Sequence, residues 1–439
     1  MHDLGLGPGD RLLTLLPNTP ATFAVGLAAM LEGVVQVALP ADLRPPEIAT
    51  IVEDAAPVAA LVGSGADSLP DDVPTRVLDE TVLDQARATA PSSDWPRTRP
   101  MAYTSGTTGR RKGVYVGVHE PAWGEAVIRD ELEAFDRRHG DRHLVVSPLY
   151  HSGPFRFAAV TVLMGGQVAV LPSFDADEFR TALRTLRPTS LFCVPTHLQR
   201  LLGLPQLEAD DLASLRLLAH AGAPCPVPVK ERVLELAPDG CVWEFYGSTE
   251  GQFTVCPPEL WRRSPGTVGA ARPGRRLELR DTTDDGIGTV WVTAPPHARW
   301  EYWRDPVKTA AAWDGDAFTV GDLGHFDGDL LHLDGRPGDL VITGGVNVYP
   351  AEVEAALRQL EGVAEAVVFG VPDEEWGERL VAAVTPEGDA DPDSTALRQA
   401  LRSELAPPKV PKQLHVVAEL PRTATGKVRR TDLPELLGP

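Results

Sequence analysis

The chain has 439 residues, of which 43% are hydrophobic and 23% are charged, and this predicts a large core and more than one domain. Its 62 acidic and 41 basic residues give a formal net charge of −21, which disfavours nucleic acid and membrane lipid as general partners. The first residues lack a basic segment followed by an apolar one, and the apolar stretches are too interrupted to cross a membrane. We therefore expect a cytoplasmic protein without a signal peptide, and a homodimer is a reasonable expectation.

Helices and strands alternate in the first part of the chain. Residues 20–31 predict a helix, with Thr19 as its N-cap and Pro20 at its first position. Apolar strands are expected at 34–39, 144–147, 167–171, 190–194 and 215–219, and a segment at 277–292 with an Asp/Gly-rich turn reads as a hairpin. This alternation predicts an α/β fold in which mixed or parallel sheets are layered with helices.

The pattern changes near residues 335–339, Gly-Arg-Pro-Gly-Asp, where we place a domain boundary. Beyond it a helix is expected from Pro350, followed by strands at 366–369, 380–384 and 414–417. About one hundred residues suffice for a small independent domain. The sequence therefore divides into a large N-terminal domain, 1–335, and a small α+β domain, 336–439.

A run rich in glycine and hydroxyl groups, from Tyr103 to Gly113, carries the strongest chemical signal. Its glycines let the backbone approach a ligand closely, and successive backbone N–H groups in such a turn form an anion site. Lys112 adds a positive charge, so the run predicts a loop that binds a polyphosphate. It is not a Walker A loop, because two residues rather than four separate its glycines and Gly113 follows the lysine.

Three further segments carry residue types that suit a nucleotide. In Glu-Phe-Tyr-Gly-Ser-Thr-Glu, residues 244–250, Tyr246 offers a flat face for a base and Glu250 is a hard oxygen ligand for Mg²⁺. In Gly-Asp-Leu-Gly, residues 321–324, Asp322 can accept hydrogen bonds from two vicinal hydroxyls. Lys427 ends the segment Pro-Arg-Thr-Ala-Thr-Gly-Lys, where a fixed cation can stabilise charge in a transition state.

These motifs, in this order, resemble those of the adenylate-forming superfamily, and the chain looks most like an acyl- or aryl-CoA synthetase. The likeness spans nearly the whole chain; Tyr246 to Glu250 match every fixed position of the family's Tyr-Gly-x-Thr-Glu, and Arg111 stands where the family usually has proline. The resemblance implies that the C-terminal domain is a mobile lid. It also implies a two-step ligase, in which ATP, Mg²⁺ and a small-molecule acid form an acyl-adenylate with release of pyrophosphate. CoA then takes the acyl group as a thioester.

The resemblance also implies roles for individual residues. Tyr246 would stack on adenine, Asp322 and Arg336 would bind the ribose, and Glu250 with Thr107 would hold Mg²⁺. The implied catalytic residues are Lys427, Glu250, Thr249 and Lys112. The implied nucleotide-binding residues are Thr104, Ser105, Gly106, Thr107, Thr108, Gly109, Lys112, Gly222, Ala223, Pro224, Glu244, Phe245, Tyr246, Gly247, Ser248, Thr249, Asp322, Leu333, Arg336 and Lys427.

Residues 148–155, Pro-Leu-Tyr-His-Ser-Gly-Pro-Phe, resemble the family's Pro-x-x-His segment, whose histidine borders the acid pocket. Adenylation domains of this superfamily that act on α-amino acids usually place an aspartate near here to bind the ammonium group, and none stands between Leu149 and Val160. The resemblance therefore implies an aliphatic or aromatic acid and not an α-amino acid. The implied pocket comprises His151, Ser152, Phe155, Ala221, Gly222, Tyr246, Gly247 and Ser248. For the second half-reaction the lid would turn about Gly338, and the thiol would pass Gly344, Gly345 and Trp376.

Two departures from the family leave other functions open. The match begins near Gly7, so the N-terminus looks shortened, and glycine stands at hinge position 338 where the family normally has Asp or Lys. The acceptor could therefore be a carrier-protein thiol or an amine, or the activated acid could be nitrite for diazotisation of an aryl amine. A luciferase-type oxygenation and a catalytically silent nucleotide-binding protein also fit the motifs, although the retained Lys112, Glu250, Asp322 and Lys427 argue against the silent protein.

Overall fold

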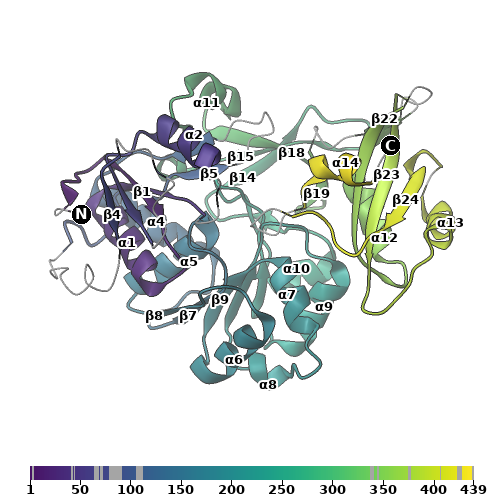
Figure 1. Cartoon of the computed structure of the whole chain (residues 1–439), viewed down its shortest axis with the longest axis horizontal. Helices are drawn as coiled ribbons and strands as arrows, with labels where there is room; N and C mark the ends of the chain where they lie inside the picture. Colours follow the sequence, from purple (N-terminus) through teal and green to yellow (C-terminus); the bar gives the residue numbers. More distant parts are fainter. Residues whose placement is uncertain are drawn as a thin grey trace. The chain divides into compact units, whose positions relative to one another are not determined.

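The structure is a computed structural model that describes residues 1, 4–40, 43, 45–63, 69, 73–78, 91–104, 112–336, 341–343, 346–373, 377–405, 407–422 and 428–437 (Figure 1). The chain forms two compact units: Met1–Glu278 with Trp291–Val320, and Leu279–Val290 with Gly321–Pro439. The expected domains 1–335 and 336–439 stay a prediction. Among the described helices, none combines the length and the apolar character needed to cross a membrane.

The first sheet of the first unit is parallel and has the strand order β2-β1-β3-β4. Its strands are β1 (Arg11–Leu15), β2 (Val35–Ala38), β3 (Ala59–Val62) and β4 (Thr75–Val77), and α1 (Pro20–Glu32) and α2 (Pro45–Ala55) connect them. The predicted cap of α1 is confirmed, because the Thr19 hydroxyl accepts a hydrogen bond from the Thr22 N–H at 3.2 Å. Gly33 ends α1 with φ of 75°, a conformation that glycine adopts without strain.

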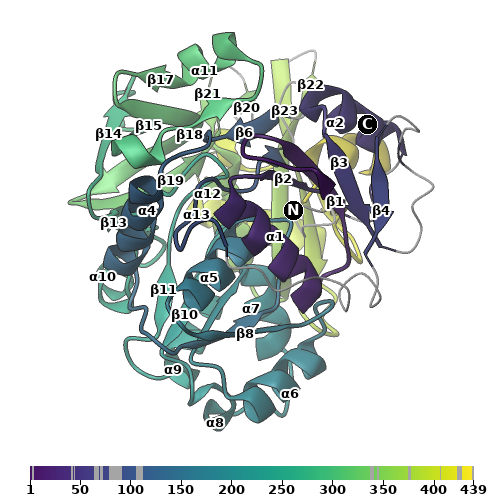
Figure 2. The same ribbon diagram turned by 90° about the vertical axis from the view of Figure 1, so that its left-hand side faces the viewer.

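A second parallel sheet forms the centre of this unit, with the order β11-β10-β9-β7-β8. Its strands are β7 (Arg142–Val145), β8 (Gln167–Val170), β9 (Ser190–Cys193), β10 (Leu217–His220) and β11 (Val242–Glu244). Along β9, Leu191 and Phe192 point to opposite faces, and both faces are buried. Helices cover the two faces (Figures 1 and 2): α6 (Ala176–Leu186), α7 (Pro195–Leu202), α8 (Ala209–Leu212) and α9 (Val227–Leu236) on one, and α4 (Pro121–Ala134) and α5 (Ser152–Leu163) on the other.

Smaller elements complete the first unit. A three-stranded antiparallel sheet has the order β16-β6-β5, with β5 (Ala102–Thr104), β6 (Lys112–Tyr115) and β16 (Glu301–Tyr302). The predicted 277–292 hairpin is confirmed as the neighbouring strands β14 (Arg276–Arg280) and β15 (Gly288–Thr293), and its segment Leu279–Val290 belongs to the second unit. The other elements are β12 (Thr254–Val255), α10 (Pro258–Arg263), β13 (Ala270–Ala271), α11 (Pro306–Ala312), β17 (Trp313–Asp314) and the 3-10 helix Pro296–Ala298.

β18 (Ala317–Asp327) leads into the second unit, where its later residues pair with β19 (Leu330–Gly335). A mixed sheet follows with the order β21-β20-β23-β22, and β24 pairs with β23. Its strands are β20 (Val341–Thr343), β21 (Val346–Val348), β22 (Val363–Asp373), β23 (Gly377–Pro386) and β24 (Gln413–Val416). The helices are α12 (Pro350–Arg358), α13 (Ser394–Glu404) and α14 (Leu433–Leu437), with 3-10 turns at Pro407–Lys409 and Arg430–Asp432. The predicted α/β class is therefore confirmed.

Candidate active site

The central parallel sheet brings three of the predicted segments to one edge. Residues 147–152 follow β7, residues 221–224 follow β10, and residues 245–250 follow β11. Since the strands are parallel, these segments leave the same, carboxyl edge of the sheet. The chain goes from β7 to β8 on one side and later to β9 on the other, and such a reversal of strand order opens a crevice at the carboxyl ends. His151, the N-cap of α5, follows β7 at this point.

The ends of the predicted phosphate loop are placed by the β5–β6 hairpin. Thr104 on β5 and Lys112 on β6 are backbone partners, so the two strands meet at the base of the loop. Lys112 also contributes to a cavity of about 310 Å³. That cavity is polar, and its lining residues are Glu53, Asp54, Lys112, Tyr302, Trp303, Arg304, Asp305 and Lys308. The base of the phosphate loop therefore opens onto a space that charged side chains surround.

Tyr302 on β16 links Lys112 to Glu250. β16 pairs with β6, which places the Tyr302 ring under the lysine, with Nζ 4.8 Å from the ring centroid. The Tyr302 hydroxyl donates a hydrogen bond to Glu250 Oε1 at 2.9 Å. Glu250 is 7% exposed, so its carboxylate is buried and this hydrogen bond orients it. The Arg99 guanidinium donates to the Glu250 carbonyl oxygen at 3.4 Å and supports the same turn.

The backbone around Tyr246 forms a tight turn closed by Gly247 and Gln252, which are bridge partners. A Cβ on Gly247 would lie 2.8 Å from the Gly251 carbonyl oxygen, so the close approach of the two chain segments needs glycine. The Tyr246 N–H donates to the Thr254 hydroxyl at 2.9 Å, and its ring packs on Phe253 with centroids 4.6 Å apart. Ser248 accepts a hydrogen bond from the Glu250 N–H at 3.2 Å, and Thr249 is half-buried.

Glu244, predicted to contact the nucleotide, is buried in an ionic cluster at the end of β11. Lys230 on α9 lies with Nζ 3.4 Å from Glu244 Oε2 and 2.5 Å from His220 Nε2. Burial raises the pKa of Glu244, against the lowering effect of the Lys230 charge. Burial and, next, the Lys230 charge lower the pKa of His220 far below its usual value, so neutral His220 accepts the hydrogen bond from the ammonium group. Glu244 is therefore held by Lys230, which His220 in turn orients.

The residues of the predicted acid pocket belong to two packing clusters. Phe155 packs against Phe23 of α1, with ring centroids 5.9 Å apart, whereas Ala221 and Phe245 pack with Phe157 and Phe192 on the central sheet. Ser152 and the turn at Gly222, Ala223 and Pro224 are exposed at the carboxyl edge.

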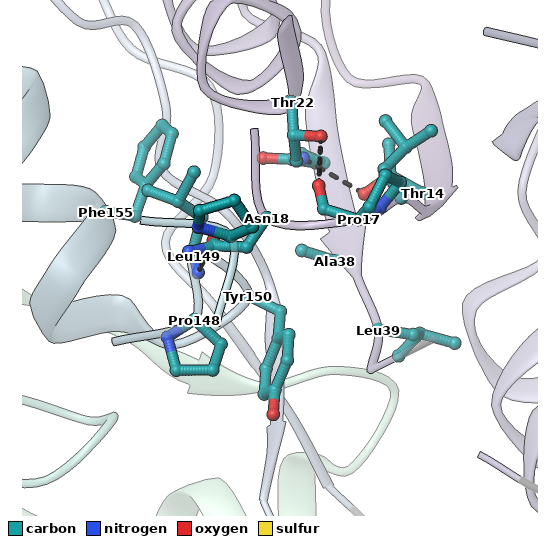
Figure 3. A pocket seen from close by; sticks show the side chains of 13 residues that line it. Thr14, Pro17, Asn18, Thr22, Ala38, Leu39, Pro148, Leu149, Tyr150 and Phe155 are labelled. Carbon is teal, nitrogen blue, oxygen red and sulfur yellow. Dashed lines mark hydrogen bonds between the residues drawn. The ribbon is translucent and has the colours of Figure 1, made fainter. Parts of the chain in front are cut away.

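On the Phe155 side lies a cavity of about 160 Å³ between the first sheet and the β7 loop. Figure 3 shows Pro148, Leu149 and Tyr150 on one side of it and Ala38 and Leu39 on the other. Asn18 joins the two sides, because its amide donates to the Leu171 carbonyl at 2.7 Å and its oxygen accepts from the Leu149 N–H at 2.9 Å.

In the second unit, the β18–β19 hairpin brings Asp322 and Arg336 together. Leu323 pairs with Gly335, and the Arg336 Nε donates to Asp322 Oδ1 at 2.5 Å. Asp322 is 9% exposed and Arg336 is exposed. Leu333, on β19, pairs with Gly324. An aspartate oriented by a guanidinium in this way can accept hydrogen bonds from a diol.

The remaining predicted residues lie outside the described residues: Ser105, Gly106, Thr107, Thr108, Gly109, Gly338, Gly344, Gly345, Trp376 and Lys427. Of Thr104, the backbone alone is described. The roles of all the predicted site residues stay predictions.

Comparison with known proteins decides the family. Residues 1–300 match the model of the AMP-binding enzyme family, and residues 352–427 match the model of its C-terminal domain. The chain belongs to the AMP-binding enzyme family. It is a ligase of the AMP-forming acyl-CoA synthetase type, as the predicted resemblance implied.

Individual relatives of the AMP-binding family are similar over most of the chain. The indoleacetate–CoA ligase of Aromatoleum aromaticum is 35% identical over 77% of this chain and 67% of its own length. A feruloyl-CoA synthase from an Amycolatopsis species is 31% identical over 99% of this chain and 90% of its own length. Among solved structures, ATP-bound MatB from Rhodopseudomonas palustris has a TM-score of 0.87 at 29% identity, covering 99% of this chain and 90% of its own. The amide bond synthetase McbA from Marinactinospora thermotolerans has a TM-score of 0.87 at 28% identity, covering 100% of this chain and 92% of its own.

The structure adds candidate site residues of this AMP-binding enzyme that sequence reasoning missed. Tyr302 contacts two predicted site residues, Arg99 supports the Glu250 turn, and Lys230 holds Glu244. The aromatic run from Trp300 to Trp303 was a signal for Tyr302. Arg99 and Lys230 carry no such signal, because a single basic residue is usually a solvated surface charge.

Proposed function

We propose that this chain activates an aliphatic or aromatic carboxylic acid, and not an α-amino acid, with ATP and transfers the acyl group to CoA. The observation that carries the proposal is the contact of Tyr302 with both Lys112 and Glu250. Tyr302 thereby keeps a cation and a buried carboxylate near the base of the phosphate loop. Phosphoryl chemistry depends on groups positioned in this way, because the protein supplies orientation and charge stabilisation and no covalent nucleophile.

Glu250 fits the role of a Mg²⁺ ligand. Its carboxylate is buried, and one oxygen is oriented by Tyr302. The described residues contain no group of three His, Cys, Asp or Glu side chains that could hold a metal ion by themselves. This suits Mg²⁺, which usually takes one or two carboxylates and completes its shell with phosphate oxygens and water. When bound, Mg²⁺ would neutralise charge that develops on the phosphate oxygens.

The chain's own residues would act by position and charge. The carboxylate of the acid would attack the α-phosphorus of ATP, and the bond from that phosphorus to pyrophosphate would break. Lys112 would bind phosphate oxygens at the base of the loop, and Asp322, oriented by Arg336, would bind the ribose hydroxyls. Lys427 would contact the α-phosphate and the acid oxygen together, where a fixed cation lowers the barrier. The CoA thiol would then attack the acyl carbon, and AMP would leave.

An amine is the second candidate acceptor, and the similarity to the amide bond synthetase McbA favours it. The same acyl-adenylate would then yield an amide. Release that neither CoA nor an amine accelerates would point to a carrier-protein thiol as acceptor, and nitrite as the activated acid is tested in parallel.

The test is release of pyrophosphate and AMP with ATP and Mg²⁺ across aliphatic, aromatic and α-amino acids, with and without CoA or an amine. A parallel reaction contains nitrite. We expect steady release that needs CoA and yields a thioester from acids that lack an α-amine. If an amine supports turnover and CoA does not, the acceptor is an amine. If nitrite is the only acid that supports turnover, the activated acid is nitrite.

A pair of variants ties the activity to the site. Glu250→Gln should abolish release with every acid, because the buried carboxylate charge is removed. The matched control is Glu125→Gln, which removes a carboxylate that is 52% exposed on α4. Full activity of Glu250→Gln would contradict the proposed metal site.

A further inference from the structure

Basic side chains gather between α4, α5 and the loop that follows β13. Three arginines surround the Glu131 carboxylate: Arg272 Nη2 at 2.9 Å, Arg137 Nη2 at 3.3 Å and Arg156 Nε at 3.6 Å. Next to it, Arg275 binds both oxygens of Asp130 at 2.8 Å each. Four guanidinium groups therefore face two carboxylates.

This cluster has more positive than negative charge, and the excess lowers the pKa values of nearby groups. Burial and then the charge of Arg156 lower the pKa of the nearby Arg99 to about 10. Burial works to raise the pKa of Glu131, but the charges of Arg156, Arg272 and Arg137 outweigh it and lower that pKa to about 2. A buried charge is costly unless it is paired, so an excess of two cations calls for an anion.

Arg156 is the member of the cluster that is available to that anion. Its guanidinium makes no hydrogen bond with any described residue, because its buried Nε lies 3.6 Å from Glu131 Oε2, beyond hydrogen-bond distance. The other three arginines each hydrogen-bond a carboxylate. The Arg156 side chain is 29% exposed, whereas those of Arg137 and Arg272 are 4% and 1% exposed. Arg156 is therefore the most exposed of the four arginines.

Arg156 lies near residues of the proposed acid site. Arg156 lies one helical turn after Ser152 on α5, so the two side chains share a face of the helix. Its guanidinium carbon is 5.8 Å from the centroid of the Phe245 ring, and Phe245 precedes Tyr246 in the loop after β11. Phe155, the neighbour of Arg156, packs on the other side against α1. The helix thus presents Arg156 to the loop that carries Tyr246 and Gly247.

A second polar side chain on this loop has no hydrogen-bond partner among the described residues. Gln252, the bridge partner of Gly247, is 4% exposed, and neither its amide nitrogen nor its amide oxygen makes a hydrogen bond in the described part of the chain. An unsatisfied buried polar group costs about 1–3 kcal/mol. A polar group delivered by a ligand would satisfy Gln252, whereas a purely apolar acid would not.

Resting on the proposed function, we propose that the acid carries a second carboxylate, which binds Arg156 at the far end of the acid site with Gln252 beside it. The second carboxylate would supply the negative partner that Arg156 needs, and it would accept a hydrogen bond from the Gln252 amide. A carboxylate is favoured over a neutral polar group because the cluster has more positive than negative charge. A planar guanidinium also binds the two oxygens of a carboxylate together.

The test compares each dicarboxylic acid with its half-amide, which has the same shape but lacks the second charge. Suitable pairs are succinate with succinamate, glutarate with glutaramate, and terephthalate with 4-carbamoylbenzoate. The quantity measured is the ratio of kcat/KM for pyrophosphate release within each pair. We expect the wild type to prefer at least one dicarboxylate by about 10- to 100-fold, the range of a charge-assisted hydrogen bond.

Variants of Arg156 then locate the preference. Arg156→Gln should bring the ratio close to one, and Arg156→Lys should keep part of it because the charge remains. Gln252→Met should lower kcat/KM for the dicarboxylate. The matched control is Arg129→Gln, because Arg129 is 63% exposed on α4 and pairs with Glu125 alone among the described carboxylates; its ratio should equal that of the wild type.

Two results would overturn the proposal. One is a wild-type ratio near one in every pair, which needs no variant and holds even if Arg156→Gln fails to fold. The other is a dicarboxylate preference that survives Arg156→Gln. Activity with monocarboxylic acids alone would refute this inference and leave the proposed function intact, whereas no activity with any acid would refute the proposed function itself.

Discussion

Replacing Tyr302 by phenylalanine removes one oxygen atom and isolates the hydrogen bond to Glu250. The ring stays under Lys112, so the cation–π contact, worth about 0.5–1 kcal/mol, is kept. The lost hydrogen bond is 2.9 Å long and goes to a buried carboxylate, and such bonds contribute about 1.5–3 kcal/mol. If that energy orients Glu250 for the metal, kcat/KM for ATP should fall by about 10- to 100-fold.

The assay is pyrophosphate release measured over a range of Mg²⁺ concentrations with a saturating acid. Tyr302→Phe should need more Mg²⁺ for half-maximal rate, and Tyr302→Leu should lose more because it removes the ring from Lys112 as well. The control is Tyr115→Phe, which removes a hydroxyl from the neighbouring strand β6 and should change the rate less than about twofold. If Tyr302→Phe behaves like Tyr115→Phe, the hydrogen bond does not orient a metal ligand and the reasoning fails.

Three further predictions follow from other contacts. Asp322→Asn should bring the kcat/KM values for ATP and 2′-deoxy-ATP close together, because a carboxylate that binds the ribose diol distinguishes them; unchanged discrimination would remove Asp322 from the ribose site. Arg272→Met should lower the free energy of unfolding by about 1.5–3 kcal/mol, because it removes the buried hydrogen bond to Glu131 while Arg137 and Arg156 stay beside that carboxylate, and a melting temperature equal to that of the wild type would argue against this. Burial lowers the pKa of His143 to about 3, below its unfolded value of 6.5, so its neutral form stabilises the fold fully above pH 6.5 and loses that contribution as the pH falls towards 3. Urea unfolding at pH 7.5 and pH 5 should therefore show a pH dependence smaller by about 2 kcal/mol in His143→Asn, and an equal dependence in both proteins would contradict the buried neutral histidine.

Local signals in the sequence sufficed for the helices and strands that depend on neighbouring residues. Thr19 and Pro20 begin α1 where the sequence predicts it, because capping and backbone preference act within one turn. The strand predicted at 144–147 is observed at Arg142–Val145. The structure starts it earlier because His143 pairs with Ser190 of β9, a partner that the alternation of apolar residues does not reveal.

The sequence by itself also named the chemistry, because Lys112 and the Glu250 segment are contiguous motifs whose residue types suit phosphate and a metal. Tertiary structure decided what surrounds them. Tyr302 reaches Lys112 and Glu250 because β16 pairs with β6, and Arg156 turns towards Phe245 because of the direction of α5. Strand pairing and the balance of buried charges depend on contacts between segments far apart in the chain. Motifs and hydrophobic periodicity describe only neighbouring residues, so they cannot predict these contacts.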